Sequence, residues 1–377
     1  MKEPLGVKSG NPEQTGNGRL DRHKLTCSIR EIYVWLLDII ECGRMKLFDF
    51  EEERVKQEIA RLGAKRVLIQ LPEGLKNDAP RLARIIEKSG ALAIVSIDPC
   101  YGACDLAMSD AEALNADLMV HYGHSKMVKY ERVPTIYIEA RASADINDAI
   151  GKALPLLEDY RRIGIATTVQ HVQTVDKARE ILVRSGKTVA VGDTRQLSYA
   201  GQVVGCNYSN AKSIAKDVEA FLFIGGGKFH AVGVALSTSK PTIVADPYDN
   251  SAYSVNNEAE KIVKQRWASI KTAEKAKTFA VLVGLKPGQK RLEEALDIKQ
   301  ILEKNRRTAF LFAAKEVTPE ALSEFPAVDA YVNTACPRLS LDDAVRFNRP
   351  ILTVREALVV VGELSWEELC KEGLLES

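Results

Sequence analysis

The sequence predicts an α/β protein of three similar domains, each with a four-stranded parallel sheet covered by helices. From about residue 50 onward, continuous apolar runs rich in β-branched residues alternate with stretches at helical spacing. The same series of four apolar runs then restarts twice. Runs that are apolar throughout are typical of strands buried on both faces, and their alternation with helices indicates βαβ units. One long doubly wound sheet is the alternative, but it does not explain why the pattern restarts.

The three domains are expected at residues 46–150, 151–255 and 256–377. The expected strands of the first are "RVLIQLPEG" (66–74), "ALAIVSID" (91–98), "ADLMVHYG" (116–123) and "TIYIEA" (135–140). Those of the second are "RIGIATTVQ" (162–170), "KTVAVGD" (187–193), "EAFLFIGGG" (219–227) and "TIVAD" (242–246). Those of the third are "TFAVLVGLKPG" (278–288), "RTAFLFAAK" (307–315), "VDAYVNTA" (328–335) and "ILTVRE" (351–356).

Residues 1–45 precede this repeat and are expected to form a partly disordered leader. The first 25 residues are polar and rich in glycine, asparagine and charge, which is typical of disorder. The next segment, "SIREIYVWLLDIIECGR", has an apolar stripe that predicts a short amphipathic helix. It is shorter than the about 20 apolar residues that cross a bilayer, and it lacks a cleavage site, so we expect neither a membrane span nor a signal peptide. Met45 is an alternative start of the chain.

Composition argues against several classes of partner. The 52 basic and 51 acidic side chains give a net charge of +1, so no overall field attracts nucleic acid or an anionic membrane. We expect neither as a partner. The seven cysteines are odd in number and sparse, unlike the disulfide framework of a small secreted protein. We expect a cytoplasmic protein with reduced thiols.

Three widely spaced cysteines follow expected strands. Cys104, in "IDPCYGACDLA" (97–107), follows the second strand of the first domain. Cys206 follows the second strand of the second domain, and Cys336 follows the third strand of the third domain. Ligands of parallel α/β sheets bind at the carboxyl ends of the strands. Three domains around a pseudo-threefold axis would therefore direct one cysteine each to a shared centre.

Three thiolates fit an iron–sulfur cluster better than zinc. Structural zinc normally has four protein ligands, and catalytic zinc sites with three are rich in histidine. A cluster held by three cysteines leaves one iron open for a substrate. Cys100 and Cys104 are spaced like the start of the radical-SAM pattern, but Ala107 occupies the third cysteine position. A cluster here therefore requires Cys206 and Cys336.

Cys100 is an alternative to Cys104 as the ligand from the first domain. Gly102 and Asp105 predict that Cys104 lies on an exposed turn that enters a helix. The N-terminus of that helix would stabilise a thiolate. We therefore favour Cys104.

Seven segments together resemble the diphthamide-synthesis 3-amino-3-carboxypropyltransferase family. They are "YGACDLA" (101–107), "HYGHS" (121–125), "GQVVGCNYS" (201–209), "GGGKFH" (225–230), "ADPY" (245–248), "VGLKPGQ" (283–289) and "NTACPRLS" (333–340). The similarity runs in order from about residue 46 to the end of the chain. No single segment is decisive, but seven in series are specific.

The resemblance implies a [4Fe–4S] cluster held by Cys104, Cys206 and Cys336, with S-adenosylmethionine (SAM) on the fourth iron. It implies transfer of the 3-amino-3-carboxypropyl group to the imidazole C2 of a histidine in translation elongation factor 2, the first step of diphthamide formation. Methylthioadenosine is then the by-product. It further implies a homodimer of the archaeal type, served by an electron donor of unknown identity. Because imidazole C2 is a poor nucleophile, a carbon radical formed by one-electron cleavage of the sulfonium is a plausible route.

A glycine run and one glutamine are candidate SAM contacts. Gly225, Gly226 and Gly227 end a strand just before Lys228, and their amides could surround the carboxylate or ribose of SAM. The alternative is a simple tight turn from strand to helix. Gln289 follows the turn "VGLKPGQ" and could reach a ligand from there.

Other polar residues are assigned more conservative roles. His121 and His124 would need two further ligands to bind zinc, so we favour a structural or substrate-positioning role. His230 could contact substrate or cap a helix. The stretch "EKIVKQRWASIKTAEKAK" predicts a solvated linking helix, whose Arg266 could touch substrate. The remaining cysteines, which we consider incidental, are Cys27, Cys42 and Cys370.

Two other functions compete with the transferase. Quinolinate synthase also joins three α/β domains around a cluster with three cysteines, but its sequences there do not resemble "YGACDLA" or "NTACPRLS". A non-catalytic iron–sulfur or electron-transfer subunit is the second alternative, although retention of all three cysteines argues against it. A sugar- or nucleotide-binding module remains if the cysteines bind no cluster.

Overall fold

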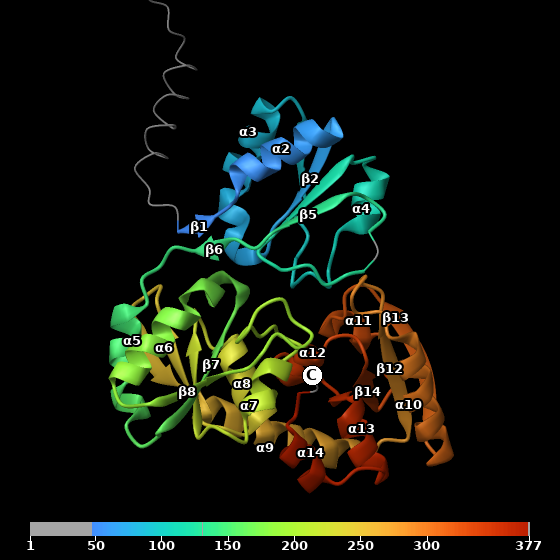
Figure 1. Cartoon of the computed structure of the whole chain (residues 1–377). Coiled ribbons are helices and arrows are strands. Elements are labelled where there is room, and N and C mark those ends of the chain that lie inside the picture. The colour runs from blue at the N-terminus through green and yellow to red at the C-terminus, as the bar shows by residue number, and fades with distance from the viewer. Residues whose placement is uncertain (1–46, 130, 376–377) are drawn as a thin grey trace, which may run out of the picture. The chain divides into compact units, whose positions relative to one another are not determined.

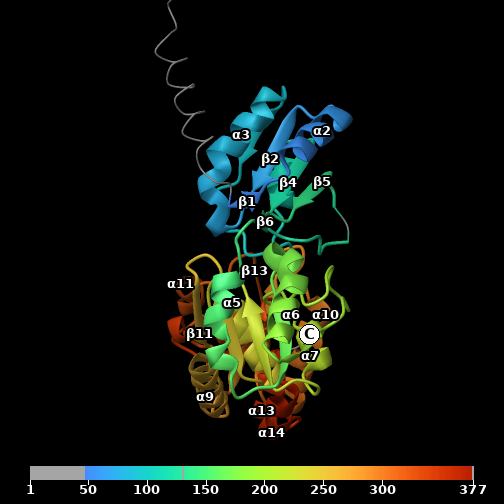
Figure 2. The ribbon, with the colours of Figure 1, turned by 60° about the vertical axis from the view of Figure 1, so that its left-hand side comes forward.

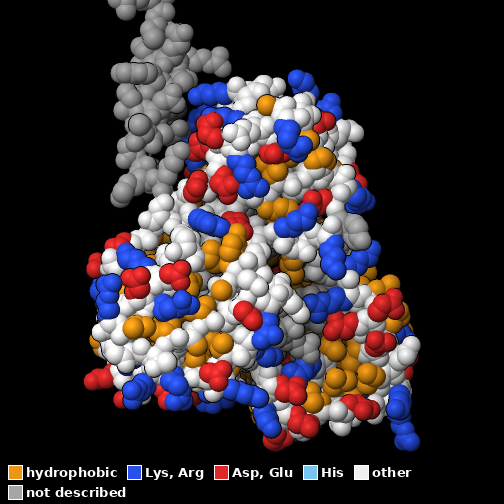
Figure 3. Space-filling view, in the orientation of Figure 1, with side chains coloured by type: hydrophobic (Ala, Val, Ile, Leu, Met, Phe, Trp, Pro, Cys, Tyr) orange, Lys and Arg blue, Asp and Glu red, His pale blue; other side chains and the backbone are white. Residues whose placement is uncertain are grey.

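All the predicted strands form, and they run parallel within three separate sheets (Figure 1). The computed structural model describes residues 47–129 and 131–375. The leader predicted for residues 1–45, with Cys27 and Cys42, lies outside the described residues. Among the described helices, none is long and apolar enough to cross a membrane. On the face shown in Figure 3, acidic and basic side chains are interspersed.

The first and third sheets have four parallel strands, as predicted, and share one strand order. The order is β3-β2-β4-β5 in the first sheet and β13-β12-β14-β15 in the third. The strands of the first are β2 (Arg66–Gln70), β3 (Leu92–Val95), β4 (Leu118–Tyr122) and β5 (Thr135–Ile138). Those of the third are β12 (Thr278–Gly284), β13 (Thr308–Ala314), β14 (Ala330–Asn333) and β15 (Ile351–Thr353).

The second sheet has five strands, so the prediction of four is wrong there. Its order is β11-β10-β9-β7-β8, and β11 (Ser251–Ser254) pairs antiparallel with β10 at the edge. The other strands are β7 (Arg162–Thr167), β8 (Thr188–Val191), β9 (Ala220–Ile224) and β10 (Thr242–Asp246). The segment "SAYS" of β11 is only half-buried and carries no apolar run, so its sequence does not predict a strand. A separate two-stranded sheet pairs β1 (Phe48–Asp49) with β6 (Arg141–Ala142).

Helices connect the strands. In the first half of the chain they are α2 (Glu52–Leu62), α3 (Ala79–Lys88), α4 (Met108–Ala113), α5 (Asn147–Ala153), α6 (Val175–Arg184) and α7 (Ser209–Ile214). In the second half they are α8 (Phe229–Thr238), α9 (Asn256–Ala273), α10 (Leu292–Lys304), α11 (Pro319–Ser323), α12 (Pro337–Leu341), α13 (Val354–Val361) and α14 (Trp366–Glu372). Short 3₁₀ helices are η1 (Glu73–Asp78), η2 (Pro155–Leu157), η3 (Val169–Thr174) and η4 (Ala344–Arg346).

Burial on both faces explains why the strands are apolar throughout. In β2, Val67 and Ile69 pack in a core with residues of α2 and α3, whereas Leu68, between them, packs with residues of α4 on the opposite face. Successive side chains of a strand point to opposite faces, so a sheet covered on both sides needs an apolar residue at every position. The α3 side of this core is supplied by Leu82 and Ile86, which are one helical turn apart.

The predicted domain boundaries are only partly reflected in the packing. Residue 150, the predicted end of the first domain, lies inside α5, and Ile150 packs in the core of the second sheet. Figure 2 shows α5 and α6 over this sheet. The second and third sheets share one core, because Phe221 of β9 and Phe279 of β12 belong to the same buried cluster. The division at 46–150, 151–255 and 256–377 stays a prediction.

α9 links the second and third sheets, but it is not simply a solvated helix. Arg266 is fully buried, at 0% exposure. Its guanidinium donates to both carboxylate oxygens of Glu356, at 2.8 and 2.6 Å. It also donates to the carbonyls of Ser340 and Ile351, each at 2.7 Å. Arg266 is therefore an internal anchor for the third domain, and the idea that it touches substrate is wrong.

Replacing this buried arginine should destabilise the protein strongly. In Arg266→Met, the carboxylate of Glu356 would stay buried without a cation, so we expect a loss of about 3–5 kcal/mol in the free energy of unfolding. Urea unfolding followed by circular dichroism measures this loss. The matched control is Arg184→Met, because the side chain of Arg184 is 78% exposed and should change stability by less than about 0.5 kcal/mol. A loss below about 1 kcal/mol in Arg266→Met would contradict the anchoring role.

Candidate functional site

The three predicted cysteines lie within electrostatic range of one another, although each follows a strand of a different sheet. Cys104 lies between β3 and α4, Cys206 between β8 and α7, and Cys336 immediately before α12. All three are half-buried free thiols. The pKa of the Cys206 thiol is raised to about 11, mainly by burial and also by the neighbouring thiols of Cys104 and Cys336. Each thiol therefore lies within electrostatic range of the other two.

The third domain contacts Cys104 directly. The N–H of Gly288 donates to the carbonyl of Cys104 at 2.8 Å. A side chain at Gly288 would meet the Cα and Cβ atoms of Cys104 at 2.6 Å. Gln289, predicted as a SAM contact, donates from Nε2 to the Sγ atom of Cys104 at 3.4 Å. Burial raises the pKa of the Cys104 thiol, and this hydrogen bond acts in the opposite direction.

Lys286 is a further part of this contact that the sequence did not reveal. Its Nζ atom lies 2.8 Å from the carboxylate of Asp105, beside Cys104, and it also pairs with Glu316. It lies 4.5 Å from the centre of the Tyr101 ring. Burial lowers the pKa of Lys286, but the two carboxylates outweigh that effect and raise it overall. The lysine therefore stays charged and ties the Cys104 loop to the third domain.

A helix N-terminus acts on Cys336 and not, as expected, on Cys104. The helix after Cys104 begins only at Met108. Cys336 is the residue that caps α12. Burial raises the pKa of the Cys336 thiol, while the backbone N–H groups of Arg338 and Leu339 oppose the rise. A helix N-terminus thus does lie beside a site cysteine, but that cysteine is Cys336 and not Cys104.

Arg338 connects the chain segments that carry Cys206 and Cys336, and the sequence did not reveal this role either. It is 5% exposed, and its guanidinium lies 3.8 Å from the centre of the Phe229 ring. Its Nη2 atom donates to the carbonyl of Phe229 at 3.0 Å, and Asp342 forms an ion pair with Nε at 2.6 Å. A side chain at Gly205 would approach both Phe229 and Arg338. Nη1 has no hydrogen-bond partner among the described residues.

The glycine run forms a tight turn between β9 and α8. Gly225 and Gly227 have positive φ angles of 147° and 74°, which favour glycine. The Gly227 N–H donates to a carboxylate oxygen of Asp246 at 3.1 Å. Lys228 forms an ion pair with Glu258. One amide and the lysine thus already have protein partners, and contact of Gly225, Gly226, Gly227 and Lys228 with SAM stays a prediction.

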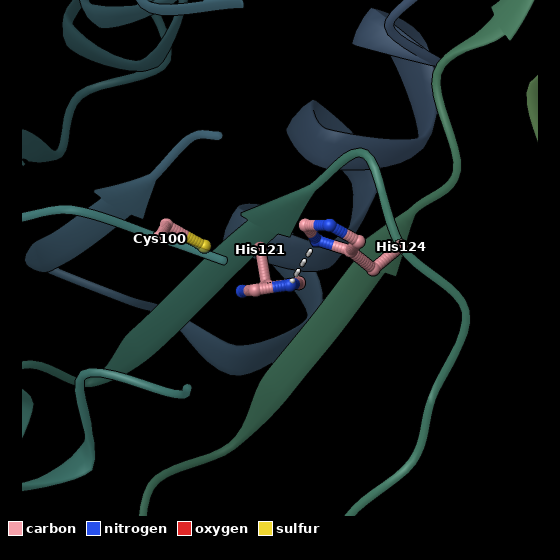
Figure 4. A group of neighbouring side chains, drawn as sticks. All are labelled: Cys100, His121 and His124. Atoms are coloured by element: carbon pink, nitrogen blue, oxygen red, sulfur yellow. Dashed lines mark hydrogen bonds between the residues drawn. The ribbon is translucent and has the colours of Figure 1, made fainter. Parts of the chain in front are cut away.

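Two histidines from different sheets, His124 and His230, lie within electrostatic range of each other. Burial lowers the pKa of His124 to about 4. The pKa of His230 is lowered to about 3, mainly by burial and also by its interactions with Arg338 and His124. Both imidazoles are therefore neutral at neutral pH. His121 lies beside His124, with Nε2 3.0 Å from Nδ1 of His124 (Figure 4).

The comparisons with known proteins agree on one family. A family model described as "putative diphthamide synthesis protein" matches residues 71–370. The 2-(3-amino-3-carboxypropyl)histidine synthase of Pyrococcus horikoshii is 38% identical over 84% of this chain and 91% of that protein. Subunit 1 of the human synthase is 30% identical over 85% of this chain and 74% of its own length. The crystal structure of Dph2 from Pyrococcus horikoshii with a 4Fe-4S cluster aligns with a TM-score of 0.77 and 37% identity, covering 84% of this chain and 92% of that one.

A methyl group at Gly288 should disturb the contact over Cys104. In Gly288→Ala, the new Cβ atom would clash with the Cys104 backbone, so we expect the free energy of unfolding to fall by about 1–3 kcal/mol. Gly151→Ala is the control, because nothing lies within 4 Å of a Cβ atom there and alanine favours helices by about 0.5–1 kcal/mol. Urea unfolding of both variants tests the difference. Equal midpoints for wild type and Gly288→Ala would show that the contact is loose.

Proposed function

This chain belongs to the diphthamide synthesis protein family, and we propose that it is a 2-(3-amino-3-carboxypropyl)histidine synthase. In this proposal it transfers the 3-amino-3-carboxypropyl group of SAM to the imidazole C2 of a histidine in translation elongation factor 2. Relatives named for this activity cover most of the chain. The observation that carries the proposal is that Cys104, Cys206 and Cys336, which follow strands of three different sheets, lie within electrostatic range of one another.

The donor set fits a [4Fe–4S] cluster with one open iron. Three free thiols from three domains approach one another, and thiolates are the usual protein ligands of such clusters. We propose Cys104, Cys206 and Cys336 as the ligands. When bound, the cluster would supply one electron for cleavage of a carbon–sulfur bond of SAM and an open iron for its amino and carboxylate groups. The Pyrococcus Dph2 structure, which contains a 4Fe-4S cluster, supports this assignment.

The surrounding protein groups suit a negatively charged centre. The thiols must lose protons on cluster binding, and burial opposes this by raising the pKa of all three. Lys286 supplies a nearby positive charge, and the charge of Arg291 lowers the pKa of Cys206. Gln289 donates directly to sulfur. Such charges and hydrogen bonds stabilise thiolates and tune the potential of a bound cluster.

Arg338 is a candidate to hold the carboxylate of SAM. Its Nη1 is buried and has no hydrogen-bond partner among the described residues. The residue lies two positions after Cys336, a proposed cluster ligand. Guanidinium–carboxylate hydrogen bonds are strong and directional. Together with the candidates Gly225–Gly227, Lys228 and Gln289, Arg338 would orient SAM so that its amino-acid side, and not the ribose, reacts.

We further propose a cytoplasmic homodimer that receives electrons from a separate donor. The relative from Pyrococcus is named without a subunit number, whereas the human relative is named subunit 1. This supports an enzyme that works without a second kind of subunit. The higher identity is to the Pyrococcus protein. The rival electron-transfer role would leave the chain without transferase activity of its own.

A reconstituted assay tests the function. The full chain is purified without oxygen, its iron and sulfide are quantified, and it is incubated with dithionite, SAM and elongation factor 2. We expect a histidine of elongation factor 2 to gain one aminocarboxypropyl group, with an equal amount of methylthioadenosine released. Iron-loaded protein that forms neither product would sink the proposal and favour the electron-transfer role. Condensation of iminoaspartate with dihydroxyacetone phosphate would favour quinolinate synthase.

The ligand assignment predicts a sharp difference between neighbouring cysteines. Cys104→Ala, Cys206→Ala and Cys336→Ala should each lower transfer to background, because each removes one cluster ligand. Iron and sulfide content, with the visible absorbance of the cluster, is the direct measurement. Cys100→Ala should retain the iron, and Cys370→Ala, on α14, should retain both iron and activity. Loss of the cluster in Cys100→Ala with retention in Cys104→Ala would reverse the assignment.

A further inference from the structure

A second group of soft ligand atoms lies in the first domain. Cys100, His121 and His124 each direct one ligand atom into the group, and all three atoms lie within 4.8 Å of one another (Figure 4). Cys100 lies in the loop after β3, His121 in β4, and His124 just beyond the end of β4. The turn at Gly123, with a φ angle of 84°, lies between the two histidines. Cys100 and His121 are 3% and 0% exposed.

Hydrogen bonds fix the protonation of His121. Gln70 donates from Nε2 to the carbonyl of Asp105 at 2.7 Å, and its Oε1 accepts from the N–H of Ala107 at 3.2 Å. The orientation of the amide is thereby set, and Oε1 faces Nδ1 of His121 at 2.9 Å. Nδ1 must therefore carry the proton. The lone pair of His121 is on Nε2, which points into the group toward His124.

We propose that Cys100, His121 and His124 bind one zinc ion, separate from the three-cysteine centre. One thiolate and two imidazoles are typical zinc ligands and exclude magnesium and calcium, which prefer oxygen. A histidine ligand usually donates its other N–H to an acceptor that orients the ring. The Gln70–His121 hydrogen bond already has that arrangement.

The geometry needs only small side-chain movements. In tetrahedral zinc sites, bond lengths of about 2.0–2.3 Å place the ligand atoms roughly 3.3–3.6 Å apart. The present His121–His124 distance is 3.0 Å, and the widest separation in the group is below 4.8 Å. Three protein ligands leave the fourth position for water or another small ligand.

The proton balance of binding is simple. Burial raises the pKa of the Cys100 thiol to about 12, so the metal-free thiol is protonated and zinc displaces one proton from sulfur. Both imidazoles are neutral, because burial lowers the pKa of His121 well below its usual value and that of His124 to about 4. In the metal-free site Nδ1 of His124 donates to Nε2 of His121, so zinc binding requires that proton to move to Nε2 of His124, which leaves a lone pair on Nδ1. No oxidant or reductant is needed.

Zinc here would fix the loop that carries Cys104. Cys100 precedes Cys104 by four residues, and Gln70, which orients His121, also holds the backbone of Asp105 and Ala107 on the far side of Cys104. The ion would hold the Cys100 end of this loop, while Gln70 holds the other end. The three residues are positioning residues for the larger centre.

Cobalt is the probe, because its absorbance reports tetrahedral geometry and thiolate ligation. The full chain with Cys104→Ser, Cys206→Ser and Cys336→Ser is titrated with Co²⁺ without oxygen, so that the larger centre contributes no thiolate. We expect one Co²⁺ per chain, a thiolate-to-cobalt charge-transfer band, and displacement by Zn²⁺. Adding Cys100→Ser should abolish that band, whereas adding Cys370→Ser should leave it. His121→Gln should weaken Co²⁺ binding by at least about 10-fold.

Two results would overturn the zinc site. One is the absence of the charge-transfer band, and the other is its persistence after Cys100→Ser. If the Cys100→Ser chain does not fold, as judged by circular dichroism, His124→Asn supplies the comparison and must weaken Co²⁺ binding by a similar factor. In wild-type chain loaded with iron, we expect one zinc per chain to survive dialysis. These readouts need no transferase activity, so they stand apart from a failure of the proposed function.

Discussion

The structure depends on one constraint: three thiols that are far apart in the chain are brought within electrostatic range of one another. Each cysteine follows a parallel strand, but this position only brings the three thiols to the same general region. The ties that complete the centre run between sheets, at or next to the cysteines. Gly288 donates a hydrogen bond to the backbone of Cys104, and Lys286 forms an ion pair with Asp105. Arg338, in the third domain, donates a hydrogen bond to the backbone carbonyl of Phe229 in the second domain. The centre is therefore a property of the packed domains and of no single sheet.

The sheets were largely predictable, because a strand that is buried on both faces has an apolar residue at nearly every position. Val67, Leu68 and Ile69 must all be apolar, and such runs are visible in sequence. Two features were not predictable for the same reason. The edge strand β11 is only half-buried, so it carries no apolar run. Arg266 looks like a solvated residue because its partner, Glu356, lies 90 residues away, and only the fold shows that the two charges are buried together.

The candidate site was predictable in its sulfur atoms and much less in its surroundings. Strand ends located Cys104, Cys206 and Cys336, because ligands of parallel sheets gather there. The helix N-terminus expected at Cys104 lies at Cys336, since the turn length after a cysteine depends on tertiary packing. The group of Cys100, His121 and His124 has no motif spacing. It forms because β2 lies between β3 and β4, so that Gln70, the last residue of β2, lies between the loop and the histidines.

The two thiols of the segment "CYGAC" point in different directions. Local spacing suggests that both belong to one metal centre. In the fold, Cys100 turns inward to the histidines, while Cys104 faces Gln289 of the third domain. The turn from Gly102 to Asp105, closed by a backbone hydrogen bond of 2.9 Å, separates them. A loop fixed at Cys100 by its own domain can present Cys104 to the other domains in a constant position, so the two thiols are complementary and not interchangeable.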